Sequence, residues 1–427
     1  MPNLPTNPRV AVIGQGAREH AITWKLAQSS QRPQLYSLPG NPGMWEISTA
    51  VAVPVDDHAE LVAWAKETNI DFVVVGPEQP LAEGVVDALQ AAGIPAFGPD
   101  RRAAQMEASK SFAKQLMRDA NVPTAAFEVF TAVDDAKAFV RKLGAPIVIK
   151  ADGLAAGKGV VIAQSIEEAD ATIVDMLEAN RFGASGSRVV IEEFLQGQEI
   201  SLMYFVDGNT AVPMMPARDF KRIGEGDTGP NTGGMGAFAP VPTFTADHAT
   251  EVTKTIIEPV LSALKSQGIV YRGVLYAGLM MTESGPKVIE FNARFGDPET
   301  EVVLPLLASD LLEVMWAVAH DGLADVDLRW HDGATVCVVL AGGEYPAKSD
   351  KGTPIQIAHQ AADDSVIFHA GTALEQQQLV TAGGRVLTVS ATAQDVPAAT
   401  QRAYEAASQV HFNQMQYRRD IAHNWQQ

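Results

Sequence analysis

The sequence has one cysteine, a shortage of basic residues and no long hydrophobic run, and each scarcity excludes a class of protein. Cys337 is the only cysteine among 427 residues, so no intrachain disulfide can form, which suits a reducing compartment. No apolar run approaches the ~20 residues that span a bilayer. The segment Met1–Arg9 lacks the apolar stretch of a signal peptide. We therefore expect a cytoplasmic protein.

Acidic residues outnumber basic ones, with 51 Asp and Glu against 32 Lys and Arg and a formal net charge of −19. A surface of this sign repels nucleic-acid backbones and anionic lipids, so we expect neither as a main partner. An anionic small molecule would have to be held by a local basic site. The apolar content of 46% is that of a globular protein, and the length suggests two to four domains of ~100–200 residues.

The first hundred residues alternate short apolar runs with helical patterns. Val10–Ile13, Gln34–Leu38 and Phe72–Val75 are expected strands, and Glu19–Gln28 and Ala59–Thr68 are expected helices between them. This alternation predicts a parallel α/β domain with helices on the faces of its sheet. Ligands of such sheets bind beyond the carboxyl ends of the strands.

After the first hundred residues the pattern becomes mixed. One polar helix is expected from about Ala103 to Asp119, and a compact unit of short strands and two helices closes with the strand Val189–Glu192. Longer strands and helices follow, and after Gly333 the chain is rich in strands with one late helix. We therefore expect a multidomain protein that combines α/β and α+β architecture, with a mixed β/α domain at the C-terminus.

A first glycine-rich loop, Gly14-Gln15-Gly16-Ala17-Arg18-Glu19-His20, follows a strand and opens a helix. Amides at a helix N-terminus attract anions, and the Arg18 guanidinium suits phosphate. A dinucleotide fingerprint would need glycine at His20 and an acid after the second strand, where Leu38-Pro39-Gly40-Asn41 stands. A smaller phosphorylated ligand fits better, and a tight turn without a ligand is the alternative.

A second glycine-rich loop, Lys150-Ala151-Asp152-Gly153-Leu154-Ala155-Ala156-Gly157-Lys158-Gly159-Val160, joins two expected strands. It is not a P-loop, because Gly159 replaces the hydroxyl residue that would hold magnesium. Lys150 ends an apolar strand and needs an anionic partner, since an unpaired buried ammonium is costly. The loop therefore suggests a lid over polyphosphate, with a solvated hairpin as the alternative.

The segment Val288-Ile289-Glu290-Phe291-Asn292-Ala293-Arg294 predicts a metal site. Residues two apart on a strand share a face, so Glu290 and Asn292 should project together while Ile289 and Phe291 point into the core. Two oxygen ligands completed by phosphate and water suit magnesium bound to a nucleotide. Arg294 lies next along that face, where it could neutralise phosphate charge. An exposed amphipathic strand would give the same alternation.

A long irregular segment adds a basic loop, Arg218-Asp219-Phe220-Lys221-Arg222, followed by the glycine-rich run Asp227–Gly236. Basic residues beside a run of backbone amides make an anion cradle. A mobile surface loop is the alternative.

Further short motifs stand in order along the chain: Pro39-Gly40-Asn41, Gly76-Pro77-Glu78 and Phe295-Gly296-Asp297-Pro298-Glu299. Together with the loops above, they resemble the phosphoribosylamine–glycine ligase (glycinamide ribonucleotide synthetase) family of the ATP-grasp superfamily. The resemblance spans most of the chain. The segments Phe368–Thr372 and Gly383–Leu387 also look like those of the family.

The resemblance implies a division into four parts. Residues 1–105 would form the N-terminal substrate-binding α/β domain, and residues 106–123 and 192–330 the central ATP-grasp domain. Residues 124–191 would form its lid, and residues 331–427 the C-terminal domain. ATP would lie between the lid and the central domain, together with Mg²⁺ or Mn²⁺.

The resemblance also implies the roles of individual residues. Catalytic roles would fall to Lys150, Arg294, Asp219 and Asn231. ATP would contact Lys110, Lys150, Gly153, Gly157, Lys158, Gly159, the hinge Glu192-Glu193-Phe194-Leu195, and Glu199. The metal would be held by Glu290 and Asn292. Phosphoribosylamine and glycine would contact Gly14, Gly16, Arg18, Glu19, Asn41, Glu78, Lys221, Gly233, Asp297 and Pro298.

The implied activity is ATP-dependent ligation of glycine to 5-phosphoribosylamine through glycyl phosphate, the second step of purine biosynthesis. Small molecules would be the only partners, and the chain would be a monomer, with a weak dimer as the alternative. Ala17 stands where the family has glycine, and Phe220 where histidine or tyrosine is usual. The strand Tyr271–Met281 lacks the additional acidic metal ligand of many superfamily members.

Three other functions remain open at this point. A different ATP-grasp enzyme, such as a carboxylase acting on bicarbonate, would form ADP without glycine. A nucleotide-binding regulator would bind ATP without releasing phosphate. A dehydrogenase is weakened by His20 and by the missing acid after the second strand.

Overall fold

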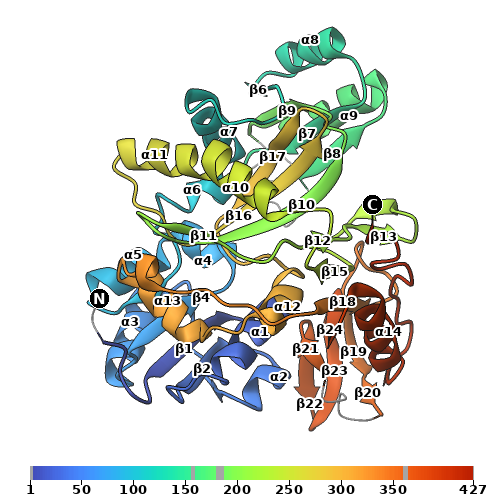
Figure 1. The fold of residues 1–427 in the computed structure, drawn as a ribbon. Coiled ribbons are helices and arrows are strands. Elements are labelled where there is room, and N and C mark those ends of the chain that lie inside the picture. Colours follow the sequence, from blue (N-terminus) through green and yellow to red (C-terminus); the bar gives the residue numbers. More distant parts are fainter. Residues whose placement is uncertain (1–2, 155–158, 179–186, 359–363, 427) are drawn as a thin grey trace.

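The computed structural model describes residues 3–154, 159–178, 187–358 and 364–426, arranged around four main β-sheets (Figure 1). In Figure 1 the N-terminal sheet lies at the lower left, the C-terminal sheet at the lower right, and the lid sheet with its helices at the top. None of the helices among the described residues is both long and apolar enough to cross a membrane.

The N-terminal sheet is fully parallel, in the order β3-β2-β1-β4-β5. Successive residues of β1 enter different cores: Val10 and Val12 pack on one face of the sheet, and Ala11 and Ile13 on the other. Both faces are therefore covered, as predicted for α/β architecture. The strands are β1 (Arg9–Gly14), β2 (Gln34–Pro39), β3 (Thr49–Ala50), β4 (Phe72–Val75) and β5 (Ala96–Phe97). The helices are α1 (Ala17–Leu26), α2 (Pro42–Trp45), α3 (His58–Glu67), α4 (Glu78–Glu83) and α5 (Val85–Ala91).

The lid sheet is antiparallel, in the order β6-β9-β7-β8. Two helices pack against it through apolar side chains such as Val140 and Ile173. In register, Lys150 pairs with Val160, so the second glycine-rich loop joins two neighbouring antiparallel strands as expected. The elements are β6 (Phe127–Phe130), α8 (Val133–Leu143), β7 (Ile147–Ala151), β8 (Val160–Ala163), α9 (Ile166–Leu177) and β9 (Val189–Glu193).

The central sheet is antiparallel, in the order β11-β10-β16-β17. Helices cover both of its faces: Val260 of α11 packs on the side of Leu202, and Met315 of α13 on the side of Met203. The strands are β10 (Gln198–Asp207), β11 (Ala211–Pro213), β16 (Arg272–Thr282) and β17 (Gly285–Asn292). The helices are α6 (Gln105–Ala108), α7 (Lys110–Asp119), α10 (Ala246–Val252), the π-helix η2 (Thr253–Ile257), α11 (Glu258–Ser266), α12 (Thr300–Val303), α13 (Leu311–Ala319) and the short 3₁₀ turns η3 (Leu304–Leu306) and η4 (Leu323–Asp325).

The single helix expected from Ala103 to Asp119 is wrong, because the chain breaks at Ser109. Ser109 has an extended backbone, with φ −138° and ψ 107°. Its hydroxyl accepts a hydrogen bond from the Phe112 amide and so caps a new helix, α7. The break makes Lys110 the first residue of α7.

The C-terminal sheet, in the order β12-β15-β18-β24-β21, joins strands from the middle and the end of the chain. Gly236 in β15 pairs with Val338 in β18, so the sheet continues across the predicted boundary at residue 331. The four-part division itself stays a prediction. The remaining elements are β12 (Arg218–Asp219), β13 (Arg222–Gly224), β14 (Thr228–Asn231), β15 (Gly236–Ala239), β18 (Ala334–Ala341), β19 (Asp350–Pro354), β20 (Gln356–Ile357), β21 (Ser365–His369), β22 (Thr372–Glu375), β23 (Gln378–Gly383), β24 (Arg385–Ala393), α14 (Val396–Ala407) and β25 (Val410–His411).

Candidate active site

A cavity of about 520 Å³ is lined by the lid sheet, the central sheet and the ends of N-terminal elements. The structure brings most of the predicted site residues to it. Those that line the cavity are Lys150, Arg294, Asp219, Asn231, Lys110, Gly159, Glu192, Glu193, Phe194, Leu195, Glu199, Glu290, Asn292, Arg18, Glu78, Lys221, Gly233 and Asp297. Gly14, Gly16, Glu19, Asn41, Gly153 and Pro298 are not part of its lining. Gly157 and Lys158 lie outside the described residues.

The predicted metal pair, Glu290 and Asn292, faces this cavity. The side chains around it do not alternate between cavity and core as predicted. Gly278 pairs with Glu290 and Leu279 pairs with Val288, so Ile289 is an extra residue in a β-bulge. Ile289 therefore lines the cavity half-buried, and its predicted place in the core is wrong.

Four cations surround Glu290. Burial alone would raise the pKa of this carboxyl, but the charges of Lys150, Lys221, Lys110 and Arg294 lower the pKa below its usual value. An ionised carboxylate is thus favoured. No group of three or more His, Cys, Asp or Glu side chains that could hold a metal occurs among the described residues. One carboxylate and one amide oxygen fit Mg²⁺ that takes its remaining ligands from phosphate and water.

Lys150 has the anionic partner that its apolar strand requires. Its ammonium lies 3.0 Å from Glu192 Oε1 and donates to the carbonyl oxygen of Ile289 at 3.0 Å. The other carboxylate oxygen of Glu192 lies 2.8 Å from Lys114 Nζ. All three charged side chains are buried, so the shared carboxylate compensates two ammonium groups. Burial lowers the pKa of Lys114 to about 8.

Sequence reasoning missed Lys114, although a signal was present. It lies four residues after Lys110, and residues at this spacing share one face of a helix. Lys110 lines the same cavity and donates to the carbonyl oxygen of Gly153 at 3.2 Å.

An apolar slot lies beside the hinge segment Glu192–Leu195. Leu195, Ala125, Met280 and Ile289 pack together there, and all four line the cavity. A flat aromatic base would find apolar surface in this slot and backbone hydrogen-bonding groups along the hinge.

An acidic and basic cluster occupies another wall of the cavity. Lys221 Nζ lies 3.0 Å from Glu199 Oε2 and 3.9 Å from Asp219 Oδ1. Burial raises the pKa of Asp219 to about 7 despite the charge of Lys221. Glu299, which sequence reasoning did not select, accepts hydrogen bonds from Ser201 and Tyr276, both at 2.9 Å.

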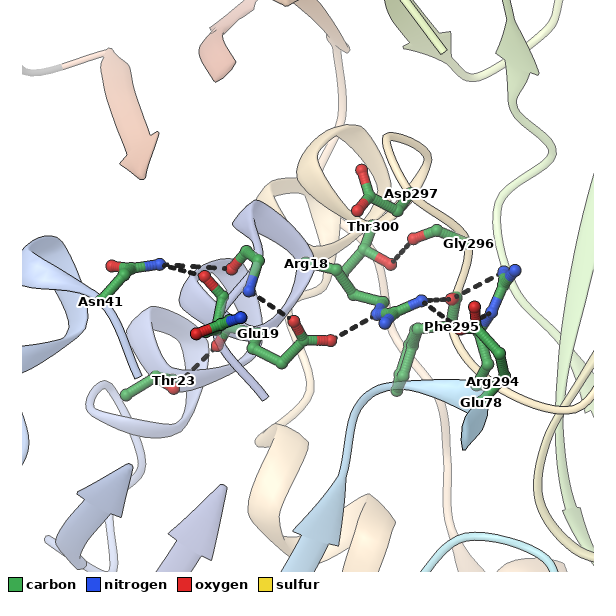
Figure 2. Close-up of polar contacts among 12 residues, drawn as sticks. Arg18, Glu19, Thr23, Asn41, Glu78, Arg294, Phe295, Gly296, Asp297 and Thr300 are labelled. Carbon is green, nitrogen blue, oxygen red and sulfur yellow. Dashed lines mark hydrogen bonds and ion pairs between the residues drawn. The ribbon is translucent and has the colours of Figure 1, made fainter. Parts of the chain in front are cut away.

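A network of ion pairs joins the N-terminal sheet to the end of β17 (Figure 2). Glu78 Oε2 lies 3.8 Å from Arg18 Nη1 and 3.5 Å from Arg294 Nε. Arg18 also pairs with Glu19, with 2.5 Å between Nε and Oε1. Burial alone would lower the pKa of Arg18, but Glu19, Glu78 and Asp297 raise the pKa above its usual value. Arg18 is therefore a fixed positive charge at the cavity wall.

Glu107 completes this network and gave no signal in the sequence. Its Oε1 lies 3.0 Å from Arg294 Nη2, and its Oε2 accepts a hydrogen bond from the Ala293 amide at 2.7 Å. Glu107 thus fixes both the side chain of Arg294 and the backbone that follows Asn292. The contact joins residues 186 apart, which no local pattern reveals.

The first glycine-rich loop is held by its own helix and by Asn41. The Gly16 amide donates to Glu19 Oε2 at 2.7 Å. Asn41 donates to the carbonyl oxygens of Gln15 and His369 and accepts from the Met44 amide. Glu19 and Asn41 therefore shape the loop in this structure, and Figure 2 shows both side chains turned toward it. Their predicted contacts with substrate stay predictions.

Two residues singled out in the sequence, Phe220 as a departure from the family and His20 as a departure from the dinucleotide fingerprint, have clear surroundings. Phe220 is buried, with the guanidinium of Arg418 5.0 Å from its ring centre and the Phe238 ring 6.3 Å away. It lies outside the cavity lining. His20 accepts a hydrogen bond from the His369 amide at 2.8 Å, which joins α1 to β21. The residue that excluded a dinucleotide fingerprint thus fastens the N-terminal sheet to the C-terminal one.

Models of three protein-family domains match the chain in order. The "Phosphoribosylglycinamide synthetase, N domain" matches residues 8–107, the "ATP-grasp (A) domain" of that family residues 108–300, and its "C domain" residues 335–424. These matches cover each of the sheets that surround the cavity.

Curated relatives are similar over nearly the whole chain. A phosphoribosylamine–glycine ligase of Halalkalibacterium halodurans is 52% identical over 412 residues, which cover 96% of either chain. The phosphoribosylamine–glycine ligase of Agrobacterium fabrum is 49% identical over 418 residues, which cover 98% of either chain.

Solved structures support the same grouping. The crystal structure of phosphoribosylamine–glycine ligase from Thermotoga maritima matches with a TM-score of 0.83 and 35% identity, over 97% of this chain and all of that one. The biotin carboxylase domain of the 2-oxoglutarate carboxylase from Hydrogenobacter thermophilus has a TM-score of 0.73 and 16% identity, over 96% of this chain and 91% of that one, which shows a shared fold alone. With domain models in order and relatives matched over nearly their full lengths, the chain belongs to the phosphoribosylamine–glycine ligase (phosphoribosylglycinamide synthetase) family of ATP-grasp enzymes.

Proposed function

We propose that this chain is an ATP-dependent carboxylate–amine ligase that joins glycine to 5-phosphoribosylamine. The products would be glycinamide ribonucleotide, ADP and inorganic phosphate, as in the second step of purine biosynthesis. One observation carries the proposal: Glu290 and Asn292 share one cavity with Lys110, Lys150 and Arg18. A metal–nucleotide site and a site for a phosphorylated amine can therefore meet in one enclosure.

In this proposal ATP lies between the lid sheet and the central sheet. The apolar slot at Leu195 and Ile289 receives the adenine, and the hinge Glu192–Leu195 reads its edge. Lys110 and Lys150 neutralise the phosphates. Glu199, matched to a ribose-binding acid, faces the same cavity.

Glu290 and Asn292 would hold the divalent metal, Mg²⁺ or Mn²⁺. Such an ion neutralises the charge that develops on the transferring phosphoryl group. The chain supplies few protein ligands, so phosphate oxygens and water complete the coordination.

The reaction then needs positioning and charge neutralisation more than covalent chemistry by the protein. A glycine carboxylate oxygen attacks the γ-phosphorus, the bond to ADP breaks, and glycyl phosphate forms. The amine of phosphoribosylamine attacks the acyl carbon, loses a proton and expels inorganic phosphate. Lys150 and Arg294 stabilise the negative charge, and Asp219 and Asn231 orient glycine.

Glycine is a small ligand, which limits its affinity. About five heavy atoms at ~1.5 kcal/mol each give a ceiling near −7.5 kcal/mol, in the micromolar range. Glycine has almost no apolar surface, so charge-assisted hydrogen bonds of roughly 1.5–3 kcal/mol must supply most of this. Asp219 and Arg294, which both line the cavity, would supply these hydrogen bonds.

One assay tests the proposal. Purified protein is supplied with ATP, Mg²⁺, glycine and freshly generated phosphoribosylamine, and each component is omitted in turn. Release of ADP and formation of glycinamide ribonucleotide should require all four. Bicarbonate-driven ADP formation without glycine would favour a carboxylase, and ATP binding without phosphate release would favour a regulator.

Other expectations accompany this proposal. We expect the protein to act in the cytoplasm, and Cys337, its single cysteine, is free and buried. We also expect a monomer that binds only small molecules. Sedimentation velocity over a range of protein concentrations would test the monomer against the weak dimer.

A further inference from the structure

The backbone of Gly233 is held on both sides by residues of the C-terminal segment. Its amide donates a hydrogen bond to Tyr345 Oη at 2.9 Å. Its carbonyl oxygen accepts one from Arg385 Nη1 at 2.7 Å. Both peptide groups of this glycine therefore depend on side chains that lie 112 and 152 residues further along the chain.

Arg385 also holds a second wall of the cavity. Its Nη1 lies 2.9 Å from Asp297 Oδ1, and Arg385, Asp297 and Gly233 all line the cavity. The guanidinium thus ties the glycine-rich loop to the segment that follows β17. An arginine at the start of β24 reaches the site because β24 pairs with β18, and β18 pairs with β15 next to the loop.

The loop is fixed to its other neighbour independently. The Thr232 amide and hydroxyl both donate to the carbonyl oxygen of Lys221, at 2.7 and 2.8 Å. Thr232 Oγ1 accepts from the Gly234 amide at 2.9 Å. One edge of the loop is thus anchored beside Lys221, and Tyr345 and Arg385 set the orientation of the peptide at Gly233.

Arg385 lies close to the Cα of Gly233 as well as to its carbonyl oxygen. A Cβ built on Gly233 would lie 3.0 Å from Arg385 Cζ, tighter than ordinary van der Waals contact. The guanidinium therefore lies directly against the backbone of the loop. Together, Tyr345, Arg385 and the peptide of Gly233 form what we call the Gly233 clamp.

We propose that Tyr345 and Arg385 are positioning residues that hold Gly233 and Asp297 in the orientation that binds the amino-acid substrate, so that the C-terminal domain completes the site. This inference rests on the proposed function. The clamp adjoins Asn231, a predicted contact of glycine, whereas most of the predicted ATP contacts, Glu199 excepted, belong to the lid, the hinge and α7. Loosening the clamp should therefore affect glycine more than ATP.

The experiment compares steady-state kinetics of Tyr345→Phe, Arg385→Gln and Arg385→Lys with those of the wild-type protein. Loss of one neutral hydrogen bond should raise the KM for glycine about 3- to 10-fold in Tyr345→Phe. Loss of the charged donor should raise it roughly 10- to 100-fold in Arg385→Gln, with partial rescue in Arg385→Lys. The KM for ATP should stay within about twofold of the wild-type value.

Arg402→Gln is the matched control. Arg402 belongs to the same C-terminal segment and pairs with Asp364 at 2.7 Å, but it does not line the cavity. This variant should keep both KM values. In the double variant Tyr345→Phe, Arg385→Gln, the effects should fall short of the product of the single effects, because both residues hold one peptide.

Each outcome decides the inference. A selective rise in the KM for glycine with an unchanged melting temperature supports the clamp. If the wild-type protein is active and the variants keep its KM for glycine, the clamp is overturned and the ligase function stands. An equal rise of the KM for glycine and the KM for ATP in the variants has the same meaning. A wild-type protein without ligase activity overturns both proposals.

Discussion

Arg18 and Arg294 donate hydrogen bonds to the same atom, the carbonyl oxygen of Phe295, at 3.3 and 3.1 Å (Figure 2). Two guanidinium groups this close would repel each other, and Glu78, which lies within 4 Å of both, offsets the repulsion. The shared contact joins the N-terminal loop to the end of β17. A bound anion would therefore meet two fixed positive charges whose positions depend on each other.

Arg18→Ala should weaken the use of phosphoribosylamine while ATP binding is retained. A charge-assisted hydrogen bond to phosphate is worth roughly 1.5–3 kcal/mol, so the KM for this amine should rise about 10- to 100-fold. Initial rates at varied amine measure this, and equilibrium binding of ATP provides the comparison. An unchanged KM for the amine would remove Arg18 from the site.

Glu290→Gln should impair turnover most severely when Mg²⁺ is limiting. Metal stabilisation of the transferring phosphoryl group is worth several kcal/mol, so kcat at limiting Mg²⁺ should fall by about 100-fold or more. Activity over a range of Mg²⁺ concentrations measures the effect. Glu283→Gln, at an exposed position in the same hairpin, should behave as the wild-type protein. Near-normal turnover at limiting Mg²⁺ would contradict the assignment of Glu290.

Glu107→Gln should lower the free energy of unfolding by about 1.5–3 kcal/mol, because Arg294 loses its charge-assisted contact with Glu107 but keeps its ion pair with Glu78. The amide oxygen of glutamine can still accept a hydrogen bond from the Ala293 amide. The measured loss of stability therefore reports the removal of the negative charge alone. Urea denaturation provides the measurement. Glu128→Gln breaks a half-exposed pair with Arg118 and should cost less than ~1 kcal/mol. Equal costs for the two variants would show that burial does not strengthen the Glu107 pair.

His20→Asn should reveal a pH-dependent contribution to stability. Burial, aided by His369, lowers the pKa of His20 from 6.5 to about 3 in the folded protein. The unfolded chain binds the additional proton between these values, so the contribution of His20 is complete above pH 6.5 and is lost as the pH falls toward 3. Between pH 7.5 and pH 5 the loss should be about 2 kcal/mol.

Asparagine keeps an acceptor near the position of Nδ1 but does not titrate. Urea unfolding of both proteins at several pH values should therefore show a stability difference that shrinks as the pH falls. A difference that stays constant from pH 7.5 to pH 5 would mean that His20 titrates equally in the folded and unfolded states.

Local patterns predicted the features that depend on short stretches of chain. The glycine-rich loop at Gly14 follows β1, the hairpin at Lys150 joins β7 and β8, and Glu290 with Asn292 faces a cavity. Each follows from strand or turn geometry within about ten residues. The local reading was wrong at Ile289, because a bulge in β17 is set by its pairing with β16.

Several cavity-lining residues were not selected from the sequence. These are Glu107, Lys114, Glu299 and Arg385. Glu299 and Arg385 stand in segments that resemble the family, and Lys114 shares a helix face with Lys110, but no local pattern predicts which partners they contact. Their partners are Arg294, Glu192, Tyr276 and Gly233, and most of these pairs join distant segments. Their roles come from neighbours that only the folded chain provides.

The sequence by itself determined the parallel N-terminal sheet, the glycine-rich loops, the exposure of Glu290 and Asn292 to one cavity, and the family, because these depend on periodicity and on short motifs. The tertiary structure alone decided which charges are compensated, and therefore which residues hold the site in place. Glu192 bridges two lysines, Glu107 fixes Arg294, and the C-terminal segment grips Gly233. The strength of a charge pair depends on the distance between its two groups, and for residues far apart in the sequence only the fold sets that distance.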